Sequence, residues 1–486
     1  MNEPVYVGID LGTQSVRVLA VTADGEVVAS AAEKLPPGKR NGVHHEQDPE
    51  AWWRAACTCL RVVTAHLGRG RQIEGLAVDS TSGTILLTDE QIRPLTPGLM
   101  YDDGRADSEA NEVNAAGAEL WRSMSYRMQP SWALPKLLWL LRHAGVSHRA
   151  RLTHQNDFVN ARLAGRWLPT DSSHALKTGY DLIRGEWPAD ILDQLQIPIA
   201  MLPLVVPPGG RIGEVGREAA AATGLPAGVP IFAGMTDGCA AQIASGATAI
   251  GSWNTVIGTT LVVKGVTREL LKDPHGVVYS HRSMDGFWLP GGASSTGAAA
   301  IAKEFSRTDL EALNAVAAKA GPTPLVVYPL VTKGERFPFA AAEAEGFTLG
   351  EANSAEDRFR GVLQGIAMLE RLAFETLDAL GAETGGRFTI SGGAVNSEAL
   401  NQTRADVLER DLQVPAITES AFGMAVLVAA AQTSMPAATA RMVRLARTIY
   451  PRRPFAEYAA QYERFLRELE RRGWLAETPR PAGVQA

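Results

Sequence analysis

The chain has 486 residues, more than one hydrophobic core usually supports, so we expect two large domains, with three as the alternative. With 45% hydrophobic and 21% charged residues, its composition is typical of a globular enzyme and excludes a disordered chain. The formal net charge of −6 gives no support to a nucleic-acid partner, which would need a basic face.

The cysteine content and the lengths of the apolar runs indicate in which cellular compartment the chain is expected. Cys57, Cys59 and Cys239 lack CxxC spacing, which argues against a disulfide framework or a structural zinc site and favours the reducing cytoplasm. The longest apolar runs are too short to cross a bilayer, so no membrane partner is expected. A first strand that begins at Val5 leaves no room for a signal peptide.

The first predicted element is a β-hairpin over Val5–Ala20, whose turn carries Asp10, Gly12 and Thr13. Gly12 lets the backbone approach a ligand closely, and exposed turn amides and the Thr13 hydroxyl can donate to phosphate oxygens. Asp10 can hold Mg²⁺ through water. The pattern therefore indicates a phosphate site, with an ordinary hairpin and polar turn as the alternative.

Strand-like runs and longer helical patterns alternate along the chain, which is typical of a layered α/β protein. After the hairpin we expect a third strand over Glu26–Ser30 and a helix that begins at Asp48-Pro49, with Asp48 as the N-cap. A buried strand is expected over Ile73–Asp79. Helices are predicted over Pro135–His143 and Arg151–Leu163.

Two clusters of polar residues follow predicted strands or lie in loops. Val78–Thr84 ends a strand with several hydroxyl groups, and Tyr101–Arg105 adds two carboxylates and a guanidinium. Such clusters suit a polyhydroxylated ligand, although the second is also explained by a solvated turn with a local ion pair. His44 and His45 are interpreted as part of a surface loop, because adjacent histidines point apart on an extended chain.

Asp237 lies where a buried strand from Val229 runs into a predicted helix over Asp237–Ser245, which Gly246 would end. The carboxyl end of a strand is a common place for a catalytic group. Asp237 is therefore either a helix cap or a base that accepts a proton from a substrate hydroxyl. Cys239 is interpreted as a packed small residue, since no histidine base adjoins it.

The second half repeats the strand, Gly-Thr turn and strand pattern over Ile250–Val263. Two related halves that face each other across a cleft would place one hairpin on each side of a nucleotide's phosphates. Arg387–Ser397 reads as a strand, a diglycine loop and an N-cap, where adenine or phosphate can lie against backbone. Phe455–Arg472 is predicted as an amphipathic helix and Thr478–Ala486 as a frayed tail.

Together these segments resemble the FGGY carbohydrate kinases, sugar kinases of the actin-like ATPase superfamily, over nearly the whole chain. Ala133 stands where Pro, Ser or Thr is usual, and Leu400 replaces a common Trp. The segments that match family motifs are Asp10–Arg17, Glu46–Trp53, Ser131–His143 with Lys136 and Trp139, Asp237, Gly258–Thr260 and Ser391–Leu408.

The resemblance implies an α/β fold with two actin-like (ribonuclease H-like) ATPase domains around a central cleft. We expect an N-terminal FGGY kinase domain over residues 1–246, a C-terminal one over 247–451, and a C-terminal helix and tail over 452–486. The implied reaction is transfer of the γ-phosphoryl group of ATP, with Mg²⁺, to a primary hydroxyl of a ketopentose. A homodimer is left open.

The resemblance also implies roles for individual residues. Asp237 corresponds to the catalytic base, and Asp10 is expected to contact the sugar and to hold Mg²⁺ through water. The sugar-binding set is Asp10, Ser82, Asp103, Arg105 and Asp237, and the nucleotide-binding set is Gly12, Thr13, Gln14, Gly258, Thr259, Thr260, Gly392, Gly393 and Asn396.

Three passages look specifically like the D-ribulose kinase branch: Asp79–Thr84, Asp171–Asp181 and Gly334–Phe339. Xylulokinases more often carry Met-His-Gly where this chain has Thr81-Ser82-Gly83. The prediction is therefore D-ribulose as the substrate, with D-xylulose or another pentulose or polyol as the alternative. A non-metabolic actin-like ATPase and a catalytically weak sugar sensor are the alternatives of other classes.

Overall fold

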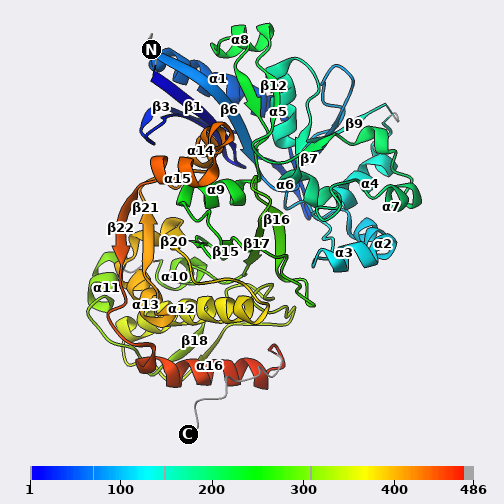
Figure 1. Cartoon of the computed structure of the whole chain (residues 1–486). Helices are drawn as coiled ribbons and strands as arrows, with labels where there is room; N and C mark the ends of the chain where they lie inside the picture. Colours follow the sequence, from blue (N-terminus) through cyan, green and yellow to red (C-terminus); the bar gives the residue numbers. More distant parts are fainter. Residues whose placement is uncertain (1–2, 69, 147–148, 307–308, 476–486) are drawn as a thin grey trace. The chain divides into compact units, whose positions relative to one another are not determined.

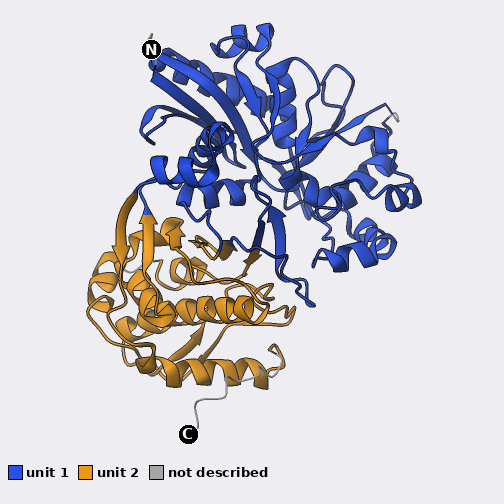
Figure 2. Cartoon of the chain, viewed as in Figure 1, with its two compact units in different colours: residues 1–250, 265–290, 415–444 blue, residues 251–264, 291–414, 445–486 orange. Residues whose placement is uncertain are grey.

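The computed structural model describes residues 3–68, 70–146, 149–306 and 309–475, and the predicted frayed tail Thr478–Ala486 lies outside them. The chain forms two compact units (Figure 2). Unit 1 comprises residues 1–250, 265–290 and 415–444, and unit 2 comprises residues 251–264, 291–414 and 445–486. The domain boundaries expected at 246/247 and 451/452 stay predictions.

Unit 1 is built on a six-stranded sheet with the order β12-β13-β6-β1-β2-β3 (Figure 1). The predicted first hairpin is confirmed: β1 pairs antiparallel with β2, and β1 also pairs parallel with β6, so that Asp10 lies opposite both Arg17 and Asp79. The strands are β1 (Glu3–Leu11), β2 (Ser15–Thr22), β3 (Val27–Lys34), β6 (Arg71–Ser80), β12 (Arg211–Glu214) and β13 (Pro230–Phe232).

Helices cover both faces of this sheet. Val5, Val7 and Ile9 pack in one core with α1 (Pro49–Leu67), whereas Tyr6, on the other face of β1, packs with α9 (Asp237–Ser245) and α14 (Ser420–Gln432). A Cβ on Gly8 would lie 1.7 Å from the carbonyl oxygen of Ala421, so only glycine lets α14 approach β1 this closely. The predicted start of α1 is confirmed, since the Asp48 carboxylate accepts from the Glu50 amide at 3.0 Å.

A five-stranded sheet in unit 1, with the order β4-β5-β8-β7-β9, corrects two predictions. The helix expected over Arg151–Leu163 is instead β9 followed by α5, because Arg151–His154 pairs antiparallel with β7. His44 and His45 are not in a surface loop but begin β5, and His45 is buried. The elements are β4 (Lys39–Asn41), β5 (His44–Gln47), β7 (Ile85–Thr88), β8 (Gly98–Leu99), β9 (Arg151–His154) and α5 (Gln155–Ala164).

The other elements of unit 1 are short. They are α2 (Asp107–Ala116), α3 (Ala118–Ser123), α4 (Ala133–His143), α6 (Ser172–Ala175), α7 (Ala189–Gln194), α8 (Arg217–Thr223), α15 (Met435–Met442), the paired strands β10 (Thr170–Asp171) and β11 (Val205–Val206), and β16 (Tyr279–Arg282). The 3₁₀ turns are Leu176–Thr178 and Ile199–Met201.

Unit 2 contains a sheet in which the strand order runs β17-β15-β14-β20-β21-β22. The repeat of the strand, turn and strand pattern is confirmed, since β14 and β15 flank the Gly258 turn as neighbours. The strands are β14 (Trp253–Ile257), β15 (Leu261–Gly265), β17 (Trp288–Ala293), β20 (Phe388–Ser391), β21 (Leu412–Pro415) and β22 (Leu445–Ile449).

Several of the remaining elements of unit 2, among them β18, β19, α12 and α16, pack around an aromatic core that includes Tyr328, Phe347 and Phe465. The amphipathic helix predicted over Phe455–Arg472 is divided at the buried Tyr458 into a 3₁₀ turn and α16. The elements are α10 (Ala299–Glu304), α11 (Leu310–Ala317), β18 (Val326–Tyr328), β19 (Phe347–Leu349), α12 (Ala355–Ala379), α13 (Glu398–Leu408), α16 (Ala459–Arg471) and the 3₁₀ turns Gly393–Asn396 and Phe455–Glu457.

Among the described residues, no helix combines the length and the apolar character that a membrane crossing requires.

Candidate active site

Asp237 is the first residue of α9, directly after the loop that follows β13 in unit 1. The predicted strand-to-helix junction is confirmed, and Thr236, not Asp237, occupies the N-cap position. Oδ1 of Asp237 accepts from the Gly238 amide at 2.7 Å, and the residue is partly exposed. An aspartate in the first helical turn is stabilised as the anion by the helix dipole, which suits a proton acceptor.

Asp10 and Asp79 form a pair of buried carboxyl groups in unit 1, opposite each other on the parallel strands β1 and β6. Burial, followed by the negative charge of Asp237, raises the pKa of Asp10 to about 6. Burial raises the pKa of Asp79 as well, and the charges of Asp10 and Asp237 raise it further. Apart from Asp10, no other described residue provides a hydrogen bond to the Asp79 side chain. Three mutually repelling carboxyl groups are a set that a bound cation would stabilise.

Backbone and side-chain hydrogen bonds fix the turn after β1. The Gly12 amide donates to the Ser15 carbonyl at 3.1 Å, so this amide is used within the hairpin. The Gln47 side-chain amide donates to the Thr13 carbonyl at 2.7 Å, and the Leu35 amide donates to the Gln14 carbonyl at 2.9 Å. Within the described chain the amides of Thr13 and Gln14 donate to no backbone carbonyl, which leaves them available to an anion.

The Ser82 hydroxyl is buried and has no hydrogen-bond partner among the described residues. Its backbone carbonyl accepts from Lys177 Nζ at 3.1 Å, which fixes the loop after β6. A buried hydroxyl without a partner is costly to maintain, because it has lost its bonds to water without replacing them. A ligand hydroxyl would supply the missing partner.

The local ion pair that the alternative interpretation expected is present between Asp103 and Arg105, but it is buried and not solvated. Asp103 is fully buried and accepts from Arg105 Nε at 2.8 Å, from Arg105 Nη2 at 2.7 Å and from the His45 amide at 2.6 Å. Burial alone would raise the pKa of Asp103, but the hydrogen bonds from Arg105 lower it overall. Arg105 also contacts Glu46 at 2.8 Å. The pair therefore fixes the loop over Tyr101–Arg105. Direct contact of either residue with the sugar stays a prediction.

In unit 2 the Gly258 turn is closed by a hydrogen bond from the Gly258 amide to the Thr260 carbonyl at 3.0 Å. The Ala298 and Ala299 amides donate to the carbonyls of Gly258 and Thr259 at 2.9 and 3.2 Å. A Cβ on Gly258 would meet no heavy atom within 4 Å. The glycine is therefore not required by packing within the chain, which is expected if the space belongs to a ligand.

The diglycine loop of unit 2 follows β20. Gly392 has a φ of 87°, and a Cβ there would lie 2.6 Å from the Ile257 carbonyl oxygen, so glycine is required. Gly393 and Asn396 are exposed, and Ser397 caps α13 as predicted by accepting from the Leu400 amide at 3.2 Å. Leu400 is fully buried, so its side chain packs in the core and does not form a platform for a base.

Asp79 is the residue that sequence reasoning missed. It belongs to the Asp79–Thr84 segment, but its partner Asp10 lies on another strand, and only the parallel register brings the two together. The described residues contain no group of three or more His, Cys, Asp or Glu side chains that could hold a metal ion by themselves. An ion at Asp10 and Asp79 would therefore share its coordination with a phosphate and water, as Mg²⁺ commonly does.

Comparison with known proteins identifies the family. Residues 5–244 match the N-terminal domain of the FGGY family of carbohydrate kinases, and residues 253–432 match its C-terminal domain. The chain belongs to this family. As an FGGY carbohydrate kinase it is a sugar phosphotransferase, which confirms the predicted enzyme class and rejects a non-metabolic actin-like ATPase.

The relatives of this FGGY kinase include enzymes for several sugars. It is 27% identical to the xylulose kinase of Escherichia coli over 84% of this chain and 86% of that one. It is 27% identical to the apulose kinase of Pectobacterium atrosepticum over 85% of this chain and 86% of that one. The solved xylulose kinase from Rhodospirillum rubrum superposes with a TM-score of 0.87 at 27% identity, over 96% and 98% of the two chains. The predicted α/β fold with two actin-like domains is confirmed.

Proposed function

We propose that this FGGY kinase transfers the γ-phosphoryl group of ATP to the primary hydroxyl of D-ribulose, giving D-ribulose 5-phosphate. The observation that carries the sugar assignment is the buried Ser82 hydroxyl without a partner, in the loop where xylulokinases more often have histidine. A small hydroxyl leaves room at that point of the sugar and offers one hydrogen bond. The xylulose kinases among the relatives support D-xylulose as the second candidate.

The proposed mechanism is mostly one of positioning. Asp237 accepts the proton of the attacking hydroxyl and orients its oxygen, and the Thr13 and Gln14 amides and the Thr13 hydroxyl bind phosphate oxygens. In unit 2 we assign Gly258, Thr259 and Thr260 to phosphate, and the loop at Gly392, Gly393 and Asn396 to the nucleoside.

Asp10, with Asp79 beside it, would hold Mg²⁺, because their oxygens are suitable ligands and a divalent cation would relieve the repulsion among these carboxyl groups and Asp237. Bound there, the ion would neutralise charge on the phosphates. We also propose a cytoplasmic location, which the three free, buried cysteines support.

The assignment is tested by measuring ADP release in a coupled assay with D-ribulose, L-ribulose, D-xylulose and glycerol. We expect the highest kcat/KM with D-ribulose. A clear preference for D-xylulose overturns the ribulose assignment and leaves the FGGY kinase assignment intact.

Ser82→Ala is expected to lower kcat/KM for D-ribulose by about 2- to 10-fold, because losing one hydrogen bond to a buried hydroxyl costs about 0.5–1.5 kcal/mol. The KM for ATP should stay unchanged. Ser82→His, which introduces the residue more common in xylulokinases, should shift preference toward D-xylulose. Steady-state kinetics with both sugars measure the effects, and a neutral Ser82→Ala variant counts against ribulose recognition at this position.

Gly258→Val is expected to raise the KM for ATP strongly without lowering thermal stability, because the new side chain would fill open space next to the phosphate turn. Gly385→Val is the matched control, since a Cβ at this exposed glycine of unit 2 also meets no atom within 4 Å. Calorimetric titration with ATP and a melting curve measure the two effects. Equal ATP affinity in both variants would show that the Gly258 turn binds no phosphate.

A further inference from the structure

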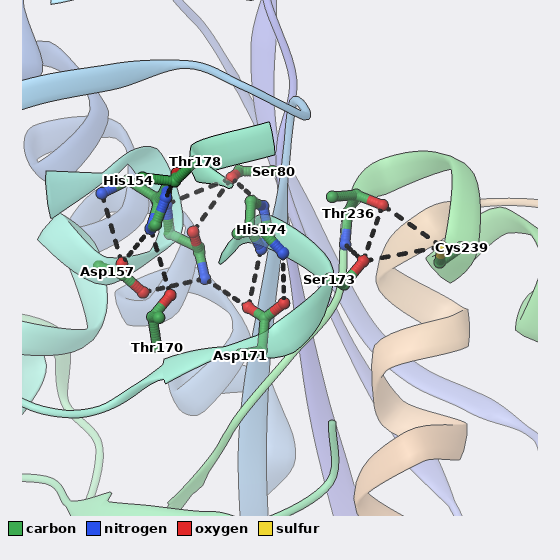
Figure 3. Close-up of polar contacts among 11 residues, drawn as sticks. Ser80, His154, Asp157, Thr170, Asp171, Ser173, His174, Thr178, Thr236 and Cys239 are labelled. Carbon is green, nitrogen blue, oxygen red and sulfur yellow. Dashed lines mark hydrogen bonds and ion pairs between the residues drawn. The ribbon is translucent and has the colours of Figure 1, made fainter. Parts of the chain in front are cut away.

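The Asp171–Asp181 passage, singled out in the sequence, has no role in the mechanism above. It begins with Asp171 and the one-turn helix α6, which lie in the interior of unit 1 (Figure 3). Ser173 and His174 are fully buried, and Asp171 is 1% exposed. Most polar side chains that are buried this deeply have hydrogen-bond partners, and the partners of these residues show which segments they hold.

His174 connects α6 to the end of β6. Its Nε2 is hydrogen-bonded to the Ser80 hydroxyl at 2.8 Å, and its Nδ1 to Asp171 Oδ2 at 2.7 Å (Figure 3). The other Asp171 oxygen accepts from the His174 amide at 2.8 Å, and Asn156 donates to Asp171 at 3.0 Å. Asp171 thus fixes both the backbone and the ring of His174. Ser80, which the ring holds, directly follows Asp79.

Ser173 connects the same turn to the start of α9. Its hydroxyl accepts from the Thr236 amide at 3.2 Å and is hydrogen-bonded to the Thr236 hydroxyl at 3.1 Å (Figure 3). The Thr236 hydroxyl also lies 3.3 Å from Cys239 Sγ within the first turn of α9. Thr236 is the residue before Asp237, and it forms an isolated parallel bridge with Ser80.

Two neighbouring residues of α6 therefore hold the two chain segments that carry Asp79 and Asp237. The bridge between Ser80 and Thr236 is where these segments meet, and α6 contacts both sides of it. We propose that Ser173 and His174 are positioning residues, which fix the end of β6 and the start of α9 and thereby place Asp237 for proton transfer. This inference rests on the proposed role of Asp237 as the base.

The physical reason is that phosphoryl transfer depends on geometry. A misplacement of about 1 Å at a reacting group costs up to about 10²-fold in rate. The β6 and α9 segments meet at this point in one backbone bridge. The start of α9 is also held by core packing of Cys239 and by the Ser420 hydroxyl, which donates to the Asp237 carbonyl at 3.3 Å, and the Ser173 hydrogen bonds add to these supports. Ser173 and His174 are both fully buried, so their effect on the reaction passes through the residues that they contact: Thr236 and Cys239 for Ser173, and Ser80 and Asp171 for His174.

The first experiment removes the link to α9. Ser173→Ala should lower kcat by roughly 10- to 100-fold with nearly unchanged KM for sugar and ATP, because only the transition state needs the precise placement of Asp237. Ser172→Ala is the matched control, since the Ser172 side chain makes no hydrogen bond within the described chain. Thr236→Val should reproduce the loss, and Thr236→Ser, which keeps the hydroxyl, should rescue kcat.

Combining Ser173→Ala with Asp237→Ala separates positioning from general structural support. If Ser173 acts through Asp237, the double variant should be no slower than Asp237→Ala alone. An equal further loss of kcat in the double variant overturns the proposal. So does a Ser173→Ala enzyme with normal kcat.

Two variants of His174 test the second link. Gln places an amide where His174 Nε2 contacts Ser80, whereas Asn places one where Nδ1 contacts Asp171. We expect His174→Gln to retain more kcat than His174→Asn, and the reverse order overturns the role of the Ser80 contact.

Hydrogen exchange gives a readout that does not depend on activity. In the Ser173→Ala protein, peptides that cover residues 230–245 should exchange faster than in the wild type, while the Ser172→Ala protein should not differ. If exchange is faster but the Asp237→Ala enzyme is fully active, Ser173 does hold the start of α9, but Asp237 is not the base. Unchanged exchange rejects the link itself.

Discussion

Asp237→Ala is expected to fold, to bind ATP with wild-type affinity and to lose about 10²- to 10⁴-fold in kcat, the usual contribution of a general base. The carboxylate lies at the first turn of α9, partly exposed, with its charge felt by Asp10 and Asp79. Steady-state ADP release measures kcat, and calorimetry measures ATP affinity.

Asp107→Ala is a suitable control for this variant, because Asp107 is an exposed first-turn aspartate of α2 in the same unit. It removes the same helix-dipole interaction, worth about 0.3–1 kcal/mol, without touching the site. If Asp237→Ala turns over at nearly the wild-type rate, Asp237 only stabilises the start of the helix and another group must accept the proton.

Local signals in the sequence predicted those parts of the site that depend on short-range chemistry. The first hairpin, the Asp48 N-cap, the start of α9 and the diglycine loop are all confirmed. Each is decided within a few residues, by a turn residue, a cap or a glycine conformation. The FGGY resemblance rested on these same segments, and for that reason the fold class and the enzyme class followed from sequence.

The failures have one cause, which is pairing between distant segments. Arg151–His154 has a helical pattern together with the residues after it, but its partner β7 makes it a strand. His45 is buried because the Asp103 loop packs onto β5. The pairing of Asp79 with Asp10 and the contacts of α6 arise only when strands far apart in sequence are placed side by side. No local propensity encodes such contacts.

Arg404 and Glu370 form a fully buried ion pair in unit 2, with two hydrogen bonds of 2.6 and 2.8 Å between α13 and α12. Arg404 also donates to Asn401 at 3.0 Å. The pair fixes α13, the helix that directly follows the diglycine loop. Its burial means that either charge, left alone, has no water to solvate it.

Arg404→Leu is therefore expected to destabilise the protein by about 3–5 kcal/mol, because it leaves the Glu370 carboxylate buried without its partner. The double variant Arg404→Leu/Glu370→Leu removes both charges and should recover most of this loss, since an apolar pair of similar volume often replaces a buried ion pair at little cost. Urea unfolding, followed by hydrogen exchange in α12 and α13, measures both variants. If the double variant is as unstable as the single one, the loss comes from packing or from Asn401, and the buried charge is not its cause.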